Sequence, residues 1–211
     1  MTVTMKTTKD RILDLLKREV ALSVNDLIDQ LGITHMAIRK HLNVLEKDGL
    51  IHSVEIKQPK GRPLYRYSLT EKGERLFPKN YEGISVEFLQ DIEESFGKES
   101  VDTLFKKREK RLTQEYKEQV EKKSGNLAKI QEIERIQNDK GYMAKASQID
   151  ENTYELIEYN CPIMAIANNF KTACKCETEM FKNVLGTDQV KRVSCKTEGN
   201  NHCKFLIKYE E

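Results

Sequence analysis

The sequence contains no tryptophan, only four prolines, and no run of eighteen or more apolar residues. The missing apolar run excludes a transmembrane helix, which needs about 20 predominantly apolar residues. The N-terminal stretch MTVTMKTTKDRI also lacks the apolar core of a signal peptide. We therefore expect a cytoplasmic protein that has no membrane partner.

Signatures of catalysis are missing as well. The sequence contains no glycine-rich phosphate loop, no dinucleotide-binding fingerprint, and no recognisable pairing of a nucleophile with a base. We therefore do not expect an enzyme.

Cysteine is absent from the first 160 residues, and all five cysteines lie in the last 51. They are Cys161, Cys174, Cys176, Cys195 and Cys203. In an intracellular chain, such clustering indicates metal or redox chemistry more than structural disulfides, and the odd count argues against a simple paired framework.

Charge is distributed unevenly along the chain. Residues 1–70 contain 12 Lys and Arg against 8 Asp and Glu, a net charge of +4, whereas the remaining 141 residues contain 24 against 26, a net charge of −2. A modestly basic first part is typical of a nucleic-acid-binding module that is joined to another domain.

Helix-start signals divide the first fifty residues into three helices. Thr8, Ser23 and Thr34 are the expected N-caps, and Gly49 is expected to end the third helix. The runs LIHSVEIK and LYRYSLT then predict two strands, joined by a tip over 58–63 that contains two prolines and a glycine. This order predicts a winged helix-turn-helix over residues 1–77.

The third helix predicts a DNA-reading face. Its apolar stripe of Ile38, Leu42 and Leu45 would face the first two helices, which leaves the polar side chains outside. The major groove, about 12 Å wide, admits one α-helix. The expected DNA-binding residues are His35, Met36, Arg39, Lys40 and Asn43 on the helix, with Lys60 and Arg62 on the wing. A generic three-helix core with a surface hairpin would show the same pattern without binding DNA.

The N-terminal pattern resembles a known class. The run DRILDLLKREVALSVNDLIDQLGITHMAIRKHLNVLEKDGLI, followed by GRPLYRYSLTEKG, resembles the DNA-binding domain of DeoR/ArsR-like bacterial regulators over residues 8–77. The resemblance implies a transcription regulator that binds double-stranded operator DNA.

The rest of the chain predicts two further parts. Residues 78–140 are mostly helical and charged, with apolar residues such as Leu104, Leu112 and Val120 on a rough stripe. We expect this region to be a helical linker that carries a homodimer interface. Residues 141–211 alternate in the manner of four strands with two helices between them, which predicts a small α+β sensor domain with an antiparallel sheet. The whole chain is thus expected to be an α+β protein.

The cysteine-containing segments resemble the sensor domain of the Suf-operon repressor family, whose members carry an iron–sulfur cluster. The segments are NCPIMAIANNFKTAC, ETEMFKNVLG, VKRVSC and EGNNHCKFLI. The resemblance implies that Cys161, Cys174 and Cys203 hold an iron–sulfur cluster, which we expect to be of the 4Fe–4S type. Cys176 and the spacing around Cys195 depart from the family pattern, and Cys195 is our leading candidate for the fourth ligand.

Residue chemistry agrees with this assignment. Cys161 and Cys174 are expected near helix N-termini, where the helix dipole favours a thiolate. Cys176 follows Cys174 by two residues and is expected to point about 200° away from it on a helix. Cys195 and Cys203 are expected on paired strands, where the register decides whether their side chains share one face.

Two alternatives remain for the sensor. Four thiolates also suit a structural zinc ion. The same domain also resembles the vinyl-reductase-type domain that encloses small apolar ligands, although core packing would explain its apolar residues equally well. The residues expected to line such a pocket are Met143, Tyr154, Ile163, Met164 and Phe181.

Together these features predict a homodimeric repressor that senses iron–sulfur or redox status. A dimer of this kind reads two half-sites about 34 Å apart along the DNA. Loss of the cluster is expected to change the geometry of the helices and to weaken operator binding.

Overall fold

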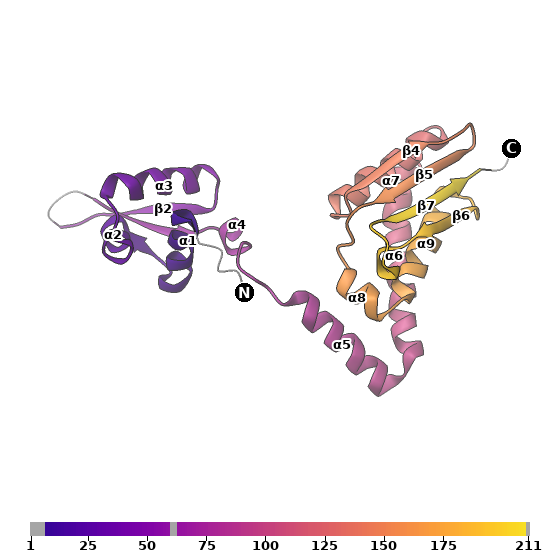
Figure 1. The fold of residues 1–211 in the computed structure, drawn as a ribbon, viewed down its shortest axis with the longest axis horizontal. Helices are drawn as coiled ribbons and strands as arrows, with labels where there is room; N and C mark the ends of the chain where they lie inside the picture. The colour runs from indigo at the N-terminus through magenta and orange to yellow at the C-terminus, as the bar shows by residue number, and fades with distance from the viewer. Residues whose placement is uncertain (1–6, 60–62, 210–211) are drawn as a thin grey trace. The chain divides into compact units, whose positions relative to one another are not determined.

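A computed structural model describes residues 7–59 and 63–209. The chain divides into two compact units, Met1–Lys79 and Asn80–Glu211 (Figure 1). None of the helices in the described part is long and apolar enough to cross a membrane.

The first unit is a three-helix core with a three-stranded antiparallel sheet. Its elements are α1 (Thr8–Glu19), β1 (Leu22–Ser23), α2 (Val24–Leu31), α3 (His35–Lys47), β2 (Ile51–Ile56), β3 (Leu64–Leu69) and the short α4 (Glu71–Glu74). The strand order is β1-β3-β2. The hairpin of β2 and β3 is the wing, so the structure has the expected winged helix-turn-helix architecture.

Local capping explains where these helices begin and end. Ser23 and Asp26 form a reciprocal capping box at the start of α2, and Thr34 accepts a hydrogen bond from an amide of α3. Gly32 ends α2 at a φ of 67°, a left-handed conformation that glycine adopts without strain. The first helix begins one residue earlier than expected, because Thr7 and not Thr8 supplies its capping side chain.

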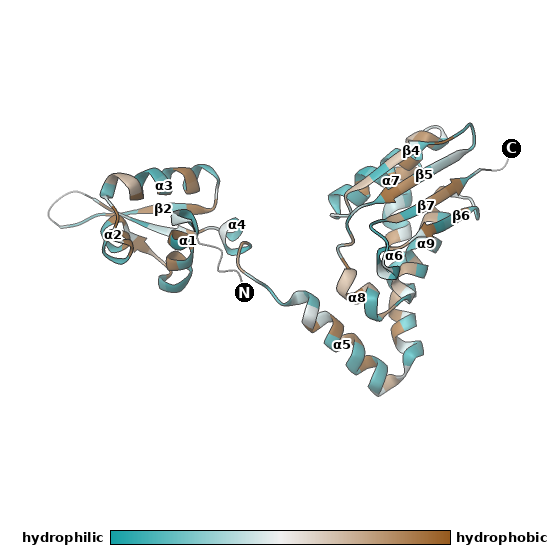
Figure 2. Cartoon of the chain, viewed as in Figure 1, coloured by the Kyte–Doolittle hydropathy of each residue, from teal (hydrophilic) through white to brown (hydrophobic). Residues whose placement is uncertain are grey.

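The core of the first unit follows from the apolar stripes of the three helices. Ile12, Leu27, Ile38 and Leu42 are completely buried, and Ile51 brings the wing sheet into the same cluster. Figure 2 shows apolar and polar residues alternating around these helices. Side chains at i, i+3 and i+4 share one helix face, so burial of that face orients each helix.

The second unit contains long helices, a four-stranded sheet and two shorter helices. Its elements are α5 (Tyr81–Phe96), α6 (Lys98–Val120), α7 (Asn126–Asp139), β4 (Ala144–Gln148), β5 (Thr153–Glu158), α8 (Met164–Asn169), α9 (Thr172–Leu185), β6 (Val190–Ser194), a 3-10 turn η1 (Lys196–Glu198) and β7 (Cys203–Lys208). The sheet is antiparallel and its strand order is β4-β5-β7-β6.

Helices cover one face of this sheet. In β7 the buried residues Cys203, Phe205 and Ile207 alternate with less buried ones, and β5 alternates in the same way. The inward-facing residues pack against α6, α7 and α9, and Phe181 of α9 meets Phe205 edge to face with ring centroids 4.9 Å apart. The period of two in the strands therefore selects which side chains reach the interior.

The helices of the middle region belong to this same unit. Tyr116 and Val120 of α6 and Ile130 and Ile133 of α7 share one core with the sheet. We had expected residues 78–140 to form a region separate from the sensor domain over 141–211. In the structure the apolar sides of α6 and α7 provide the cover that the sheet needs, so the two regions form one compact unit.

Candidate functional site

The outer face of α3 presents the side chains expected to read DNA. His35, Arg39, Lys40 and Asn43 are exposed, and Met36 is 80% exposed. The helix is held by its opposite side, which is buried against α1 and α2, and by the capped turn before it. All five helical residues therefore share one accessible face. Lys60 and Arg62, expected on the wing, lie outside the described residues.

Three of the cysteines meet at the end of the β6–β7 ladder. Cys174 lies in the first turn of α9, Cys195 directly follows β6, and Cys203 begins β7. Ser194 pairs with Lys204, so Cys195 and Cys203 occupy the next opposed positions beyond that pair. Cys195 and Cys203 are buried, whereas Cys174 is half-buried.

The guanidinium of Arg192 lies at the centre of these thiols. Its Nη1 is 3.5 Å from the sulfur of Cys203 and 3.9 Å from that of Cys195. Its Nη2 donates to the carbonyl of Cys174 at 2.9 Å and to Glu177 at 2.8 Å. The guanidinium also stacks over the ring of Phe205, 4.4 Å from its centroid. One cation thus fixes three segments of the chain relative to one another.

Thiol acidity differs sharply within the cluster. Burial raises the pKa of Cys174 to about 11 and that of Cys203 to about 12. Burial also acts on Cys195, but hydrogen bonds from Thr197 and the charge of Arg192 outweigh it and lower its pKa. Cys195 is therefore the thiol most easily ionised among these three.

The expected position at a helix N-terminus is wrong for Cys161 and confirmed for Cys174. Cys161 does not open a helix: α8 begins at Met164 and has only six residues. Burial instead raises the pKa of Cys161. Cys174 does lie in the first turn of α9, and burial raises its pKa.

The charge of Arg192 acts on Cys161 as it does on Cys174, Cys195 and Cys203. Cys161 lies in the turn before α8, where its carbonyl accepts a hydrogen bond from Met164. The carboxylates of Glu177 and Glu158 and the guanidinium of Arg192 all act on its thiol. The Cys161 thiol is therefore influenced by charges that also act on the other thiols.

Cys176 lies elsewhere, in agreement with the helical geometry. It packs with Val101 and Phe105 of α6 in a separate apolar cluster, where the charge of Glu109 acts on its thiol. It does not belong to the thiol cluster and provides a natural control for experiments on the other four.

Several charged and polar residues of this interior were not singled out from the sequence. Glu158 is only 1% exposed and accepts a hydrogen bond from Gln137, which in turn accepts one from the Tyr116 hydroxyl. Burial, together with the charge of Glu177, raises the pKa of Glu158 well above its ordinary value. The alternation of TYELIE could have identified Glu158, because it shares the inward face of β5 with Tyr154 and Leu156.

The cysteines and their neighbours form a donor set of mixed fit to a metal centre. Within residues 7–59 and 63–209, no three His, Cys, Asp or Glu side chains are arranged ready to hold a metal ion. The chemistry of the set nevertheless suits a thiolate-bound group, since the sulfurs of Cys195 and Cys203 lie beside Arg192, the Cys174 carbonyl binds the same guanidinium, and one thiol is readily ionised. Arg192 and the amide of Lys196 also donate to the sulfurs, as hydrogen-bond donors do around iron–sulfur clusters.

The expected apolar pocket is not formed by its five residues. Met143 is 64% exposed, while Tyr154 and Phe181 belong to the main core and Ile163 packs against a different cluster with α6. The side chains fill cores or face solvent, so core packing accounts for the buried members of the set.

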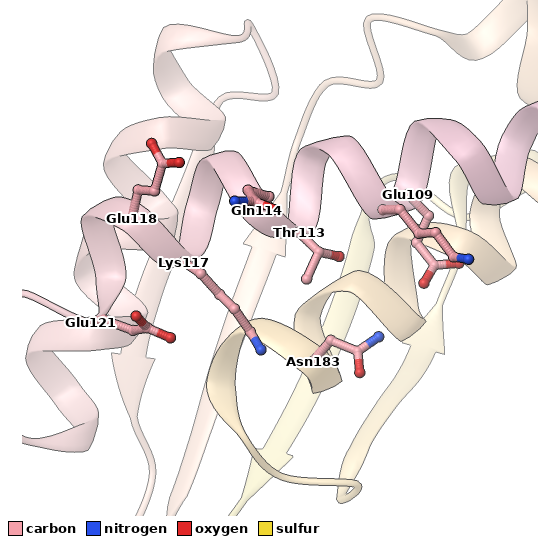
Figure 3. A pocket seen from close by; sticks show the side chains of 8 residues that line it. Glu109, Thr113, Gln114, Lys117, Glu118, Glu121 and Asn183 are labelled. Carbon is pink, nitrogen blue, oxygen red and sulfur yellow. The ribbon is translucent and has the colours of Figure 1, made fainter.

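A groove of the second unit lies between α6 and α9 (Figure 3). Lysine and glutamate side chains of α6 line it, with Asn183 of α9 opposite. Charges of both signs are mixed along it, and no cysteine lines it. The groove favours no class of ligand over another.

Comparisons with known proteins support the winged helix-turn-helix fold of the first unit. Residues 11–54 match the family model of a helix-turn-helix domain. The first unit carries a helix-turn-helix domain. On a three-helix core with a wing, this is a DNA-binding domain of the kind that transcription regulators carry. No curated protein matches the chain.

Three solved structures illustrate the similarity. The transcriptional regulator PA4135 is 27% identical over 47% of this chain and 71% of its own, with a TM-score of 0.31. Bacillus subtilis PadR in complex with operator DNA is 19% identical over 65% and 94%, with a TM-score of 0.31. The phenol-responsive sensory domain of the transcription activator PoxR, with phenol, is 12% identical over 81% and 89%, with a TM-score of 0.44. All three TM-scores lie below 0.5, so these similarities assign neither a fold nor a ligand to the whole chain.

Proposed function

We propose that the chain is a homodimeric transcription repressor that reads operator DNA through α3 and senses iron–sulfur status through its thiol cluster. The observation that supports sensing is the convergence of Cys174, Cys195 and Cys203 on one buried arginine. The exposed face of α3 supports DNA reading.

DNA reading follows from what α3 leaves exposed. Arg39 and Lys40 bear the positive charge of this face, and Asn43 offers both a donor and an acceptor to a base edge. His35 lies at the N-terminus of the helix, where backbone amides favour a phosphate. In this proposal the wing, including Lys60 and Arg62, contacts the flanking phosphates.

The cluster would be held by Cys161, Cys174 and Cys203, with Cys195 as the fourth ligand. When bound, a 4Fe–4S cluster supplies a group that oxidation or iron shortage destroys. Arg192 would keep its hydrogen bonds to the sulfurs and offset the negative charge of the thiolates. The chain's own contribution is to bring the turn before α8, the first turn of α9 and the β6–β7 hairpin into one place.

The fold offers a route from the thiols to the DNA-reading unit. An apolar cluster contains Phe170 and Ala173, which precede Cys174 in sequence, together with Val101 and Phe105 of α6. Leu89 of α5 packs against this apolar cluster. The helix α5 begins directly after the first unit ends. A structural change at the thiols would therefore alter the packing of α5, the helix that follows the DNA-reading unit in the chain.

The proposal is tested by metal analysis of anaerobically purified protein. We expect iron and sulfide together with a broad visible absorbance in the wild type, and loss of both in Cys161→Ser, Cys174→Ser and Cys203→Ser. Cys176→Ser should retain them, because its thiol packs against α6. If the protein is colourless and contains one tightly bound zinc ion, the thiols bind zinc and not an iron–sulfur cluster. Equal iron in the wild type and in all three variants would overturn thiol ligation.

A further inference from the structure

We propose that Cys195 and Cys203 form a reversible intramolecular disulfide when a hydroperoxide oxidises the metal-free protein. The inference deepens the proposed function, because it gives the same site a second, metal-independent response. It rests on the arrangement of the two sulfurs, and it can be tested without iron.

Strand register places these two residues opposite each other. Ser194 pairs with Lys204, and continuing the antiparallel ladder by one step opposes Cys195 to Cys203. A register shift between Arg192 and Ser194 precedes this pair. Directly opposed residues of antiparallel strands have Cβ atoms about 4.5–5.5 Å apart. A disulfide needs Cβ atoms about 3.5–4.5 Å apart, so closure requires a movement on the order of 1 Å.

Hydrogen-bond donors hold both sulfurs at this end of the ladder. Arg192 Nη1 is within 3.9 Å of both, the Lys196 amide donates to Cys203 at 3.4 Å, and the Thr197 hydroxyl lies 3.2 Å from Cys195. The guanidinium cannot swing away freely, because Glu177 and the Cys174 carbonyl hold its other nitrogen. Arg192 Nη1 thus keeps the sulfurs of Cys195 and Cys203 on the same face of the sheet.

The other cysteines are placed less favourably for this bond. Cys176 belongs to the apolar cluster against α6, and Cys161 lies in the turn before α8. Cys174 also lies near Cys195, but it belongs to a helix that must keep its own backbone hydrogen bonds. A bridge between Cys174 and Cys195 is the main competing outcome.

The oxidation is balanced with hydrogen peroxide as the oxidant. The sulfur of Cys195 attacks one peroxide oxygen, the O–O bond breaks, and hydroxide leaves and takes up the thiol proton as water. The Cys203 sulfur then attacks the sulfenic sulfur of Cys195, the S–O bond breaks, and a second water leaves. Two thiols lose two protons and two electrons in total, and a dithiol reductant reverses the change.

The test uses the full chain after reduction and removal of metal with a chelator. Dilute hydrogen peroxide should remove two of the five free thiols, lower the mass by two hydrogens, and link the peptides that contain Cys195 and Cys203. Dithiothreitol should restore all five thiols. Cys176→Ser should behave like the wild type and lose two of its four thiols.

Two variants make the assignment falsifiable. Cys203→Ser should form no disulfide and should leave Cys195 reactive toward a sulfenic-acid trapping reagent, and Cys195→Ser should form neither product. Circular dichroism checks that both variants fold. No thiol loss in the wild type, or a link through Cys161 or Cys174, would overturn the proposal. Absence of iron from the wild-type protein would overturn the proposed function without affecting this result.

Discussion

At the residue scale, Arg192 joins polar groups from three segments of the second unit. It contacts two thiols, one carbonyl and the carboxylate of Glu177, and its side chain is only 12% exposed. A buried charge that loses its partner is strongly destabilising, whereas an exposed pair contributes little. Arg192 should therefore matter for stability as well as for the thiols.

Replacing Arg192 by Leu leaves Glu177 buried without its cation. We expect the free energy of unfolding to fall by about 3–5 kcal/mol, as found when one partner of a buried pair is removed. Urea denaturation followed by circular dichroism measures the change. The matched control is Lys182→Leu, which breaks the more exposed pair with Glu179 and should cost less than about 1 kcal/mol. Equal losses in the two variants would contradict a structural role for the buried pair.

The buried carboxyl of Glu158 makes stability depend on pH. Its pKa in the folded protein is raised well above the ordinary value of 4.5. As the pH rises above about 4.5, the unfolded chain loses the Glu158 proton while the folded chain keeps it. The free energy of unfolding therefore falls by up to about 1.4 kcal/mol per pH unit. The fall stops once the pH exceeds the folded pKa.

Glu158→Gln should remove this contribution and flatten the stability profile above a pH of about 4.5. Urea denaturation at a series of pH values measures it. Glu118→Gln, an exposed change on α6, should leave the slope as in the wild type. An unchanged slope in Glu158→Gln would mean that the carboxyl is ionised in the folded protein.

Two exposed cations of α3 are expected to contact operator DNA. Arg39→Ala and Lys40→Ala should each cost about 1–3 kcal/mol of binding if the side chain reads a base, and should lower the salt dependence if it contacts a phosphate. Fluorescence anisotropy with promoter DNA at several salt concentrations separates these outcomes. Lys145→Ala in β4 is the control for the loss of one surface charge. Wild-type affinity in the Arg39→Ala/Lys40→Ala double variant would refute this reading face.

At the scale of single elements, capping decides where the helices of the first unit begin. Ser23 accepts from the Asp26 amide at 3.2 Å, and its own amide donates to the Asp26 carboxylate at 2.8 Å. These bonds satisfy amides that the helix itself leaves without partners. The start of α2, and hence the turn that leads into α3, depends on them.

Ser23→Ala should lower the free energy of unfolding by about 1–2 kcal/mol, because the cap is lost from a buried position. Denaturation monitored through the amide signals of the first unit measures this change. Ser95→Ala, at an exposed position inside α5, should change stability by no more than about 0.5 kcal/mol, since alanine is a good helix former. A smaller effect for Ser23→Ala than for Ser95→Ala would contradict the importance of the cap.

At the scale of the whole molecule, the expected homodimer requires an accessible apolar surface. The helix α5 has one: Tyr81, Ile84 and Phe88 are 71%, 42% and 59% exposed and recur at helical spacing. Other apolar residues of the same helix, Leu89 and Ile92, pack within the unit. The exposed stripe is the part of α5 that a second copy would cover.

The double change Ile84→Glu/Phe88→Glu should therefore convert a dimer into a monomer, because two carboxylates would be buried in the interface. Light scattering at micromolar concentration gives the molar mass. Glu87→Gln, on the same helix but without a new charge, should remain dimeric. A monomeric wild-type protein would refute the dimer itself, whereas a dimeric double variant would place the interface elsewhere.

Much of this architecture could be predicted from the sequence because it depends on local interactions. The Ser23 capping box, the end of α2 at Gly32 and the apolar stripe of α3 each involve residues within a few positions of one another. The same locality explains why Cys174 and Cys176 were expected to point apart on one helix. Such features need no knowledge of what lies across the fold.

Only the tertiary structure decided which distant groups meet. After a register shift Ser194 pairs with Lys204, which makes Cys195 and Cys203 the next opposed positions, and a further shift of one residue would send them to different faces. The meeting of Arg192 with α9, the burial of Glu158 and the turn that carries Cys161 likewise depend on how helices cover the sheet. These contacts join segments far apart in the chain, where single-residue propensities carry no information, so packing and strand register determine them.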